Sequence, residues 1–194
     1  MFESIKQMSD AVKPAATLLS DRVSVTNPGA VTGDLIDKLA WTAAFGADAE
    51  TRGTARWIIR SLAAAVGVRP ASIHDLYMAM GRGDAGGFTV PAINVRAMAY
   101  DTARAVVRSA KKLNAGAFIF EIARSEIGYT EQRPHEYAAI VLAAALRENF
   151  RGPIFIQGDH VQTNAKKFNS PDRDKELDAL PALAPGRIRM PVAD

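Results

Sequence analysis

The segment Pro153-Ile-Phe-Ile-Gln-Gly-Asp-His-Val-Gln-Thr-Asn164 joins a short apolar run to a polar turn. Residues 153–157 are predicted to form a buried strand, and Gly158, Asp159 and His160 follow at its carboxyl end. In parallel α/β folds, ligands bind at the carboxyl ends of the strands. The segment therefore predicts a strand of a parallel sheet that ends in two ionisable residues placed to reach a ligand.

Strands and helices also alternate N-terminal to this segment. Residues 88–95 (FTVPAINV) and 117–122 (AFIFEI) are short apolar runs, while residues 97–113 and 134–149 have helical periodicity. Strands about 30 residues apart, each followed by a helix, indicate βα units around a parallel sheet. Strands this apolar are usually covered on both faces.

The rest of the chain divides into an N-terminal extension, a linker and a tail. Residues 1–80 are predicted to form helices only, as an α-helical extension of the βα units in residues 81–180. The glycine-rich residues 81–87 precede a strand and not a helix, which favours a linker over a phosphate-binding loop. Residues 172–180 begin like another helix.

Prolines at 181, 185 and 191, with a glycine at 186, predict an irregular tail over residues 181–194. We expect this tail to come from a frameshift or a truncated gene, and a short native tail is the alternative.

Composition excludes several classes of protein and site. The 194 residues are 48% hydrophobic and 23% charged, as in soluble globular proteins. Because the chain has no cysteine, it has no disulfide framework, thiolate metal site or cysteine nucleophile. The net charge of +3 is spread along the chain, no segment is apolar enough to cross a membrane, and the N-terminus is not a signal peptide. We expect a cytoplasmic protein with no nucleic-acid or membrane partner.

The polar residues after residues 153–157 could act on a ligand. His160 could bind a divalent metal through a neutral imidazole nitrogen, and Asp159 could act beside it as a general acid or base. The alternative is that Asp159 caps the next helix and His160 packs passively. His74 and His135 are not expected to bind metal, because both lie in predicted helical segments away from the strand ends.

The other two strands add polar groups at the same edge. Asn94 ends the first strand, and Glu121 lies within the second, where a carboxylate is costly unless it is paired or functional. Glu121 could face a cation or form a structural pair with Arg124 or another arginine. Arg124 and Ser125 follow on a predicted loop, where they could hold a phosphate or simply be solvated.

In order and spacing, FTVPAINV, FIFEIARSEIGYT and GPIFIQGDHVQTN resemble the first three barrel strands of class II fructose-bisphosphate and tagatose-bisphosphate aldolases. The resemblance covers about residues 72–170. It implies a (β/α)₈ TIM barrel and the reversible, metal-dependent aldol cleavage of a ketose bisphosphate to dihydroxyacetone phosphate and an aldehyde phosphate. Zinc would be the Lewis acid.

The resemblance also assigns roles to individual residues. His160 matches a metal ligand, and Asp159 matches the residue that takes the proton from the C4 hydroxyl. Asn94 matches a substrate contact, and Glu121 and Ser125 are added as substrate-binding candidates. A lysine that could form a Schiff base is missing from the strand ends, in agreement with a metal-dependent reaction.

The sequence departs from the family pattern in two ways, in the length available for a barrel and in the number of histidines available to bind zinc. A (β/α)₈ barrel takes at least about 200 residues, whereas about 107 residues follow Gly87. No histidine follows His160, and a catalytic zinc normally has three protein ligands. We therefore expect a barrel truncated after about three βα units, inactive by itself, whose full-length form is a homo-oligomer.

Two other functions are compatible with the sequence. The Gly158-Asp159-His160 segment, with Glu121 followed by Gly128-Tyr129-Thr130, is also similar to the non-catalytic type of tagatose-bisphosphate aldolase subunit. The second alternative is a small α/β nucleotide-binding or interaction module in which Asp159 and His160 are structural.

Overall fold

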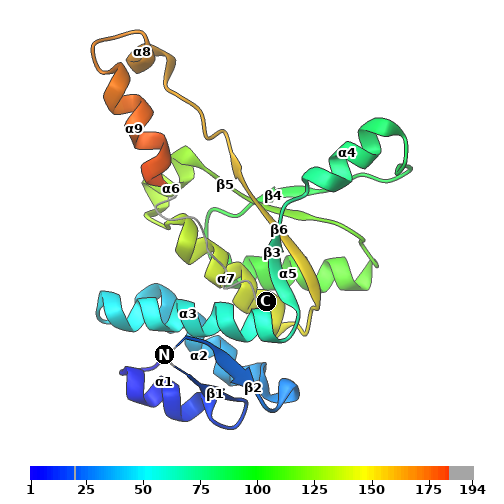
Figure 1. The fold of residues 1–194 in the computed structure, drawn as a ribbon, viewed down its shortest axis with the longest axis vertical. Helices are drawn as coiled ribbons and strands as arrows, with labels where there is room; N and C mark the ends of the chain where they lie inside the picture. The colour runs from blue at the N-terminus through cyan, green and yellow to red at the C-terminus, as the bar shows by residue number, and fades with distance from the viewer. Residues whose placement is uncertain (20, 184–194) are drawn as a thin grey trace.

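Four parallel strands form the central sheet of the protein (Figure 1). The structure is a computed structural model that describes residues 1–19 and 21–183. The strands lie in the order β3-β6-β5-β4, and all neighbouring pairs are parallel. Their bounds are β3 (Val68–Ala71), β4 (Ala92–Asn94), β5 (Ile119–Ala123) and β6 (Gly152–Asp159). The predicted α/β class with a parallel sheet is confirmed.

The three predicted βα units supply most of this sheet. Helix α5 (Ala99–Lys112) connects β4 to β5, and α7 (Pro134–Arg147) connects β5 to β6. Consecutive strands β4, β5 and β6 are therefore neighbours, as in a sheet built from successive βα crossovers. β4 is shorter than predicted and begins directly after Pro91, which has no N–H to donate to a ladder.

The prediction that residues 1–80 form helices only is wrong. Strands β1 (Ala16–Leu18) and β2 (Val23–Val25) make an antiparallel pair, and β3 joins the main sheet beside β6. Pairing with β6, whose residues lie 84 positions further along the chain than their partners, selects the extended conformation of β3. No local sequence pattern predicts this strand. Pro70 fits this position because β3 is an edge strand. The helices of this half are α1 (Ile5–Val12), η1 (Pro28–Ala30), α2 (Gly33–Phe45), α3 (Ala49–Ala65) and α4 (His74–Arg82).

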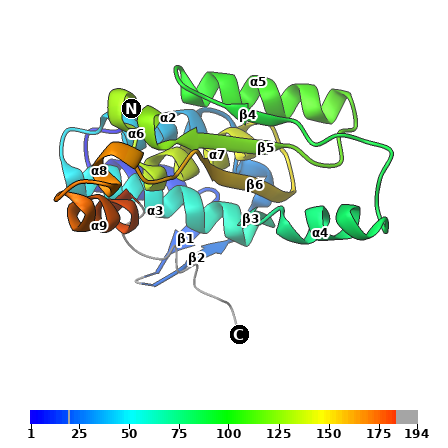
Figure 2. The ribbon, with the colours of Figure 1, turned by 90° about the horizontal axis from the view of Figure 1, so that it is seen from above.

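Helix α7 is the centre of the hydrophobic core. Every residue from Tyr137 to Leu146 is buried. One side of the helix packs against β3, β5 and β6, and α2, α3 and α5 pack against the others (Figure 2). A helix that is apolar on all sides is stable only when it is enclosed in this way. The N-terminal helices and the sheet therefore share one core.

The two faces of the sheet differ in chemistry. Phe120 and Ile122 of β5 belong to the hydrophobic core, so the alternate residues Ile119, Glu121 and Ala123 point to the opposite face. Residues paired across parallel strands lie on the same face. Asn94 and Gln157 pair with Glu121, and Asp159 pairs with Ala123, so these polar residues share the face opposite to α7.

Three further helices follow the carboxyl ends of two strands, one after β5 and two after β6. Residues 124 and 125 begin α6 (Arg124–Thr130), so the predicted loop at this position is wrong. The helix forms because the Glu126 carboxylate accepts the N–H of Ala123 at its start. After α8 (Ala165–Phe168), helix α9 (Arg173–Leu183) continues through Pro181, although a tail was predicted from that residue.

The fixed φ of proline is compatible with a helix, and the cost of a proline, a lost hydrogen bond and a clash with the carbonyl four residues earlier, does not end α9 before residue 183. The rest of the predicted tail, residues 184–194, lies outside the described residues. In the described part of the chain, no helix combines the length and the apolar character needed to cross a membrane.

Candidate functional site

Two residues from different strands meet at the carboxyl edge of the sheet. Asn94 Nδ2 at the end of β4 donates a hydrogen bond to Asp159 Oδ2 at the end of β6, with 3.1 Å between the two atoms. β5 lies between them, and the residue that pairs with Asp159 is Ala123, whose methyl group leaves space for the contact. The sheet therefore brings together two of the residues that the sequence singled out as site candidates.

Glu126 holds this pair in place, and sequence analysis did not single it out. Its Oε2 accepts hydrogen bonds from Asn94 Nδ2 at 3.1 Å and from the N–H of Ala123 at 2.8 Å, and its Oε1 pairs with Arg96 Nε at 2.5 Å. Burial alone would raise the pKa of Glu126, whose side chain is 4% exposed. The hydrogen bonds from Ala123, Arg96 and Asn94 outweigh burial and hold that pKa below its usual range.

The amide of Asn94 is thereby fixed in one orientation. Its nitrogen donates to both Glu126 and Asp159, which uses both N–H groups. The carbonyl oxygen of the side chain must then point away from the two carboxylates. Glu126 could have been found from the sequence. It follows the strand end at Ala123 by three residues, the spacing at which a carboxylate caps the start of a helix.

Glu121 is held within the sheet. Gln157 Nε2 donates to Glu121 Oε1, and the backbone oxygen of Glu121 accepts a 2.8 Å hydrogen bond from the Tyr137 hydroxyl. Glu121 is buried, with 8% of its surface exposed. The predicted structural pair with Arg124 does not form, because Arg124 pairs with Glu176 instead.

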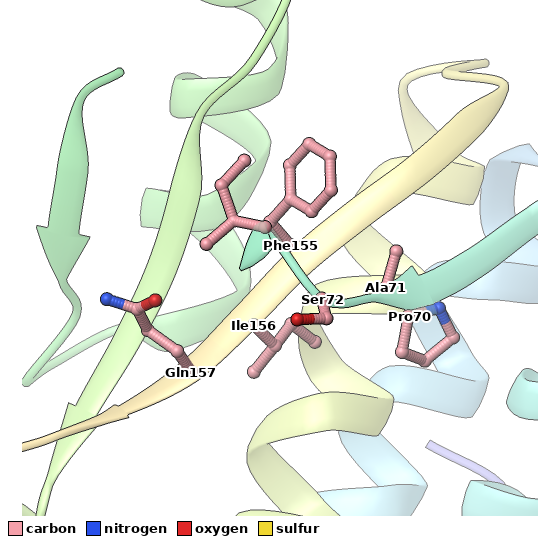
Figure 3. Close-up of a pocket in the computed structure, with 7 residues that line it drawn as sticks. Pro70, Ala71, Ser72, Phe155, Ile156 and Gln157 are labelled. Carbon is pink, nitrogen blue, oxygen red and sulfur yellow. The ribbon is translucent and has the colours of Figure 1, made fainter. Parts of the chain in front are cut away.

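A cavity of about 320 Å³ lies beside Gln157 on the β3 side of β6 (Figure 3). β3 pairs with β6 only as far as Phe155, and the chain then turns away through Ser72 into α4. Residues from both strands and from this turn line the space: Pro70, Ala71, Ser72, Ile73, Phe155, Ile156 and Gln157. The cavity is therefore the space left where the shorter strand ends.

Ser125 and Arg124 do not join Asn94 and Asp159. Ser125 is exposed on α6, and its hydroxyl makes no hydrogen bond to another described residue. Both Nη nitrogens of Arg124 bind Glu176 of α9, with 3.2 Å between Nη2 and Oε2. The hydrogen bonds from Arg124 and from the N–H of Asn164 lower the pKa of Glu176 to about 2. Arg124 therefore fastens α9 to α6, and its guanidinium is engaged.

His160 follows β6 with a left-handed backbone angle, φ +47°. Its side chain is 75% exposed, and its Nε2 lies 3.5 Å from Asp159 Oδ1. The alternative in which Asp159 caps the next helix is wrong, because the N-cap of α8 is Asn164. Asp159 and His160 are therefore adjacent and accessible at the strand edge.

His135, which was not expected to bind metal, lies near the start of α7 and contacts two arginines of α3. Arg56 Nη1 lies 2.7 Å from His135 Nε2, and Arg60 Nη2 donates to the His135 backbone oxygen at 2.5 Å. Arg56 also pairs with Glu136 at 2.5 Å. Burial and then the charges of Arg56, Arg60 and Arg133 lower the pKa of His135 below its ordinary value of 6.5.

Acidification is expected to destabilise the protein through His135. The folded state binds a proton at this ring less readily than the unfolded chain does, so stability is full above pH 6.5 and is lost as pH falls through the lower folded pKa. Thermal unfolding between about pH 7.5 and pH 5 should show this loss, with carboxylates contributing below that range. His135→Gln should flatten the profile, whereas His74→Gln, at an exposed position, should not. An unchanged profile in His135→Gln would contradict the assignment.

A complete zinc centre is not present among residues 1–19 and 21–183. No group of three His, Cys, Asp or Glu side chains in this part of the chain lies close enough together to hold a metal ion. Asp159 and His160 are adjacent, but Glu126 is already engaged by three donors. Because a catalytic zinc normally has three protein ligands, this residue set by itself does not fit the metal.

The arrangement offers one accessible carboxylate, one oriented amide and one exposed imidazole at a strand edge. Asp159 can accept a proton, and the Asn94 carbonyl can accept a hydrogen bond from a ligand hydroxyl. Comparisons with protein-family models, with curated proteins and with solved structures find no match to this chain.

Proposed function

We propose that this chain is a part of a class II ketose-bisphosphate aldolase, in which β4, β5 and β6 are consecutive strands of a (β/α)₈ barrel. The contact between Asn94 and Asp159, at 3.1 Å, carries the proposal. These residues are 65 positions apart in the sequence, and the family resemblance assigned both to the site. The neighbour order β4-β5-β6 supports it further, since successive barrel strands lie side by side.

Asp159 is the proposed proton acceptor. During cleavage it takes the proton of the C4 hydroxyl, the C3–C4 bond breaks, and its electrons remain with the dihydroxyacetone phosphate part. Asn94 holds the Asp159 carboxylate in position, because its amide nitrogen donates to Asp159 and is itself fixed by Glu126. Asp159 is partly exposed, as a residue that meets a substrate must be.

Among the described residues, we propose His160 alone as a zinc ligand. A metal bound there would polarise the carbonyl of the dihydroxyacetone phosphate part. The described residues do not complete a ligand set around His160, so further ligands would have to come from outside them. The remaining parts of the proposal are a phosphorylated sugar as substrate, a cytoplasmic location and a homo-oligomer in the full-length form.

A second function is binding of a phosphorylated sugar without turnover, as in a non-catalytic aldolase-like subunit. The incomplete ligand set around His160 favours it. Asn94 and Asp159 would still bind sugar hydroxyls by hydrogen bonds, which need no metal.

A metal-dependence experiment separates the two functions. Cleavage of fructose bisphosphate and of tagatose bisphosphate by the full-length form is measured in a coupled assay after chelation with EDTA and after zinc is restored. The aldolase proposal expects activity that zinc restores and that His160→Ala abolishes, while His74→Ala leaves it unchanged. Calorimetric binding of a bisphosphate without cleavage would support the second function. If the protein neither cleaves nor binds these sugars, both proposals fail.

A further inference from the structure

A groove of about 670 Å³ lies on the helical side of the molecule, apart from the strand-edge cavity. It is enclosed by α2, the start of α5, the end of α6 and α7. The larger side chains that line it are Trp41, Phe45, Met98, Tyr100, Tyr129 and Ile140. Small-molecule sites in proteins have volumes of roughly 300 to 1,000 Å³, so the groove has the size of a ligand site.

Large apolar side chains are unusually exposed around this groove. Trp41 is 52% exposed, Phe45 64%, Met98 74% and Tyr129 64%. The rings of Trp41 and Phe45, one helical turn apart on α2, have centroids 5.2 Å apart and are tilted by 37°. Apolar surface gathered in this way marks a binding surface more often than scattered exposed residues do. The tilted pair offers aromatic faces to a further planar ring.

The walls of the groove are fixed by contacts on their far sides. The Tyr100 hydroxyl donates to Asp37 at 2.7 Å, and Asp37 also accepts from Arg147 at 3.0 Å. Glu136, at the α7 side, is engaged by Arg56 at 2.5 Å. The groove is therefore formed before any ligand arrives, which lowers the entropic cost of binding.

One cation at the mouth of the groove has unused hydrogen-bond donors. Arg96 binds Glu126 through Nε, and neither of its Nη nitrogens has a hydrogen-bond partner among the described residues. The side chain is 65% exposed. The nearby carboxylate of Asp101 lies 3.6 Å from Arg104 Nη1, so it has a cation of its own. The two Nη groups of an arginine match a carboxylate, sulfonate or phosphate in a two-point hydrogen bond.

We propose that this groove is a binding site for a planar aromatic anion. The ring lies against Trp41 and Phe45, and the anionic group binds the free Nη nitrogens of Arg96. The site does not use Asp159 or His160, so its ligand would not contact the residues proposed for proton transfer and metal binding. Arg96 nevertheless connects it to that chemistry, because its Nε holds Glu126, which holds Asn94.

The test uses naphthalene-2-sulfonate as the anionic probe and naphthalene-2-methanol as its neutral counterpart, both titrated by calorimetry. We expect saturable binding of one sulfonate per chain. Trp41→Ala should weaken it about 10-fold, because the stacking surface is lost. Arg96→Gln should weaken the sulfonate about 10-fold and leave the neutral probe nearly unchanged. Phe88→Ala is the matched control, since Phe88 is 47% exposed but does not line the groove.

Three results would overturn the proposal. The first is sulfonate binding that Trp41→Ala leaves unchanged, and the second is wild-type protein that binds both probes equally well. The third comes from sedimentation. A wild-type dimer that Trp41→Ala dissociates would show that a second copy covers the groove. Circular dichroism of each variant verifies that the loss of binding is not a loss of fold.

Discussion

Leu142→Ala is expected to lower the free energy of unfolding by about 3 to 4 kcal/mol, the largest effect of any single truncation proposed for this fold. Leu142 is 1% exposed in the middle of α7, and it belongs to the core that includes Ile58 of α3 and Phe120 of β5. Removing its isobutyl group leaves a cavity that neither the helices nor the sheet can fill, since α7 is packed on all sides.

Urea unfolding monitored by circular dichroism measures this loss. Leu113→Ala is the matched control, because Leu113 is 77% exposed after α5 and should change the stability by less than about 0.5 kcal/mol. Two separate transitions in Leu142→Ala, one for the N-terminal helices and one for the sheet, would contradict the single shared core. So would a loss no larger than that of the control.

Asp159→Asn in the full-length form is expected to lower kcat in the cleavage assay about 100-fold or more, with little change in stability. Asparagine has the size of aspartate, and its side-chain oxygen can still accept the hydrogen bond from Asn94. It cannot accept the C4 hydroxyl proton, so the loss should fall on kcat and not mainly on KM.

Asp172→Asn serves as the control for this variant. Its carboxylate is 59% exposed and, among the residues that the structure describes, forms an ion pair only with Lys175, at 3.2 Å. Activity and melting temperature of the control should equal those of the wild type. Asp159→Asn with a kcat close to wild type would remove Asp159 from the proposed role, whereas a large drop in melting temperature would assign it to structure.

The candidate site was accessible to sequence reasoning only in part. Asn94 and Asp159 could be found because each ends an apolar strand, and carboxyl ends of parallel strands share an edge. Glu126 and Arg96 were missed, since neither stands at a strand end and their pairing depends on how α6 is placed against β4. Ser125 was selected because it follows the strand on a predicted loop, where it could hold a phosphate, but it lies in helix α6 and is exposed to solvent.

The sequence by itself determined the βα units around β4, β5 and β6, because apolar periodicity over 4 to 16 residues fixes which faces must be buried. It also determined that α7 is enclosed, since a helix without a polar face must be covered. Only the tertiary structure decided that β3 pairs with β6 and that the N-terminal helices share a core with the sheet. Those choices depend on backbone hydrogen bonds and packing between residues far apart in the chain, for which four residues such as Val68–Ala71 carry no local signal.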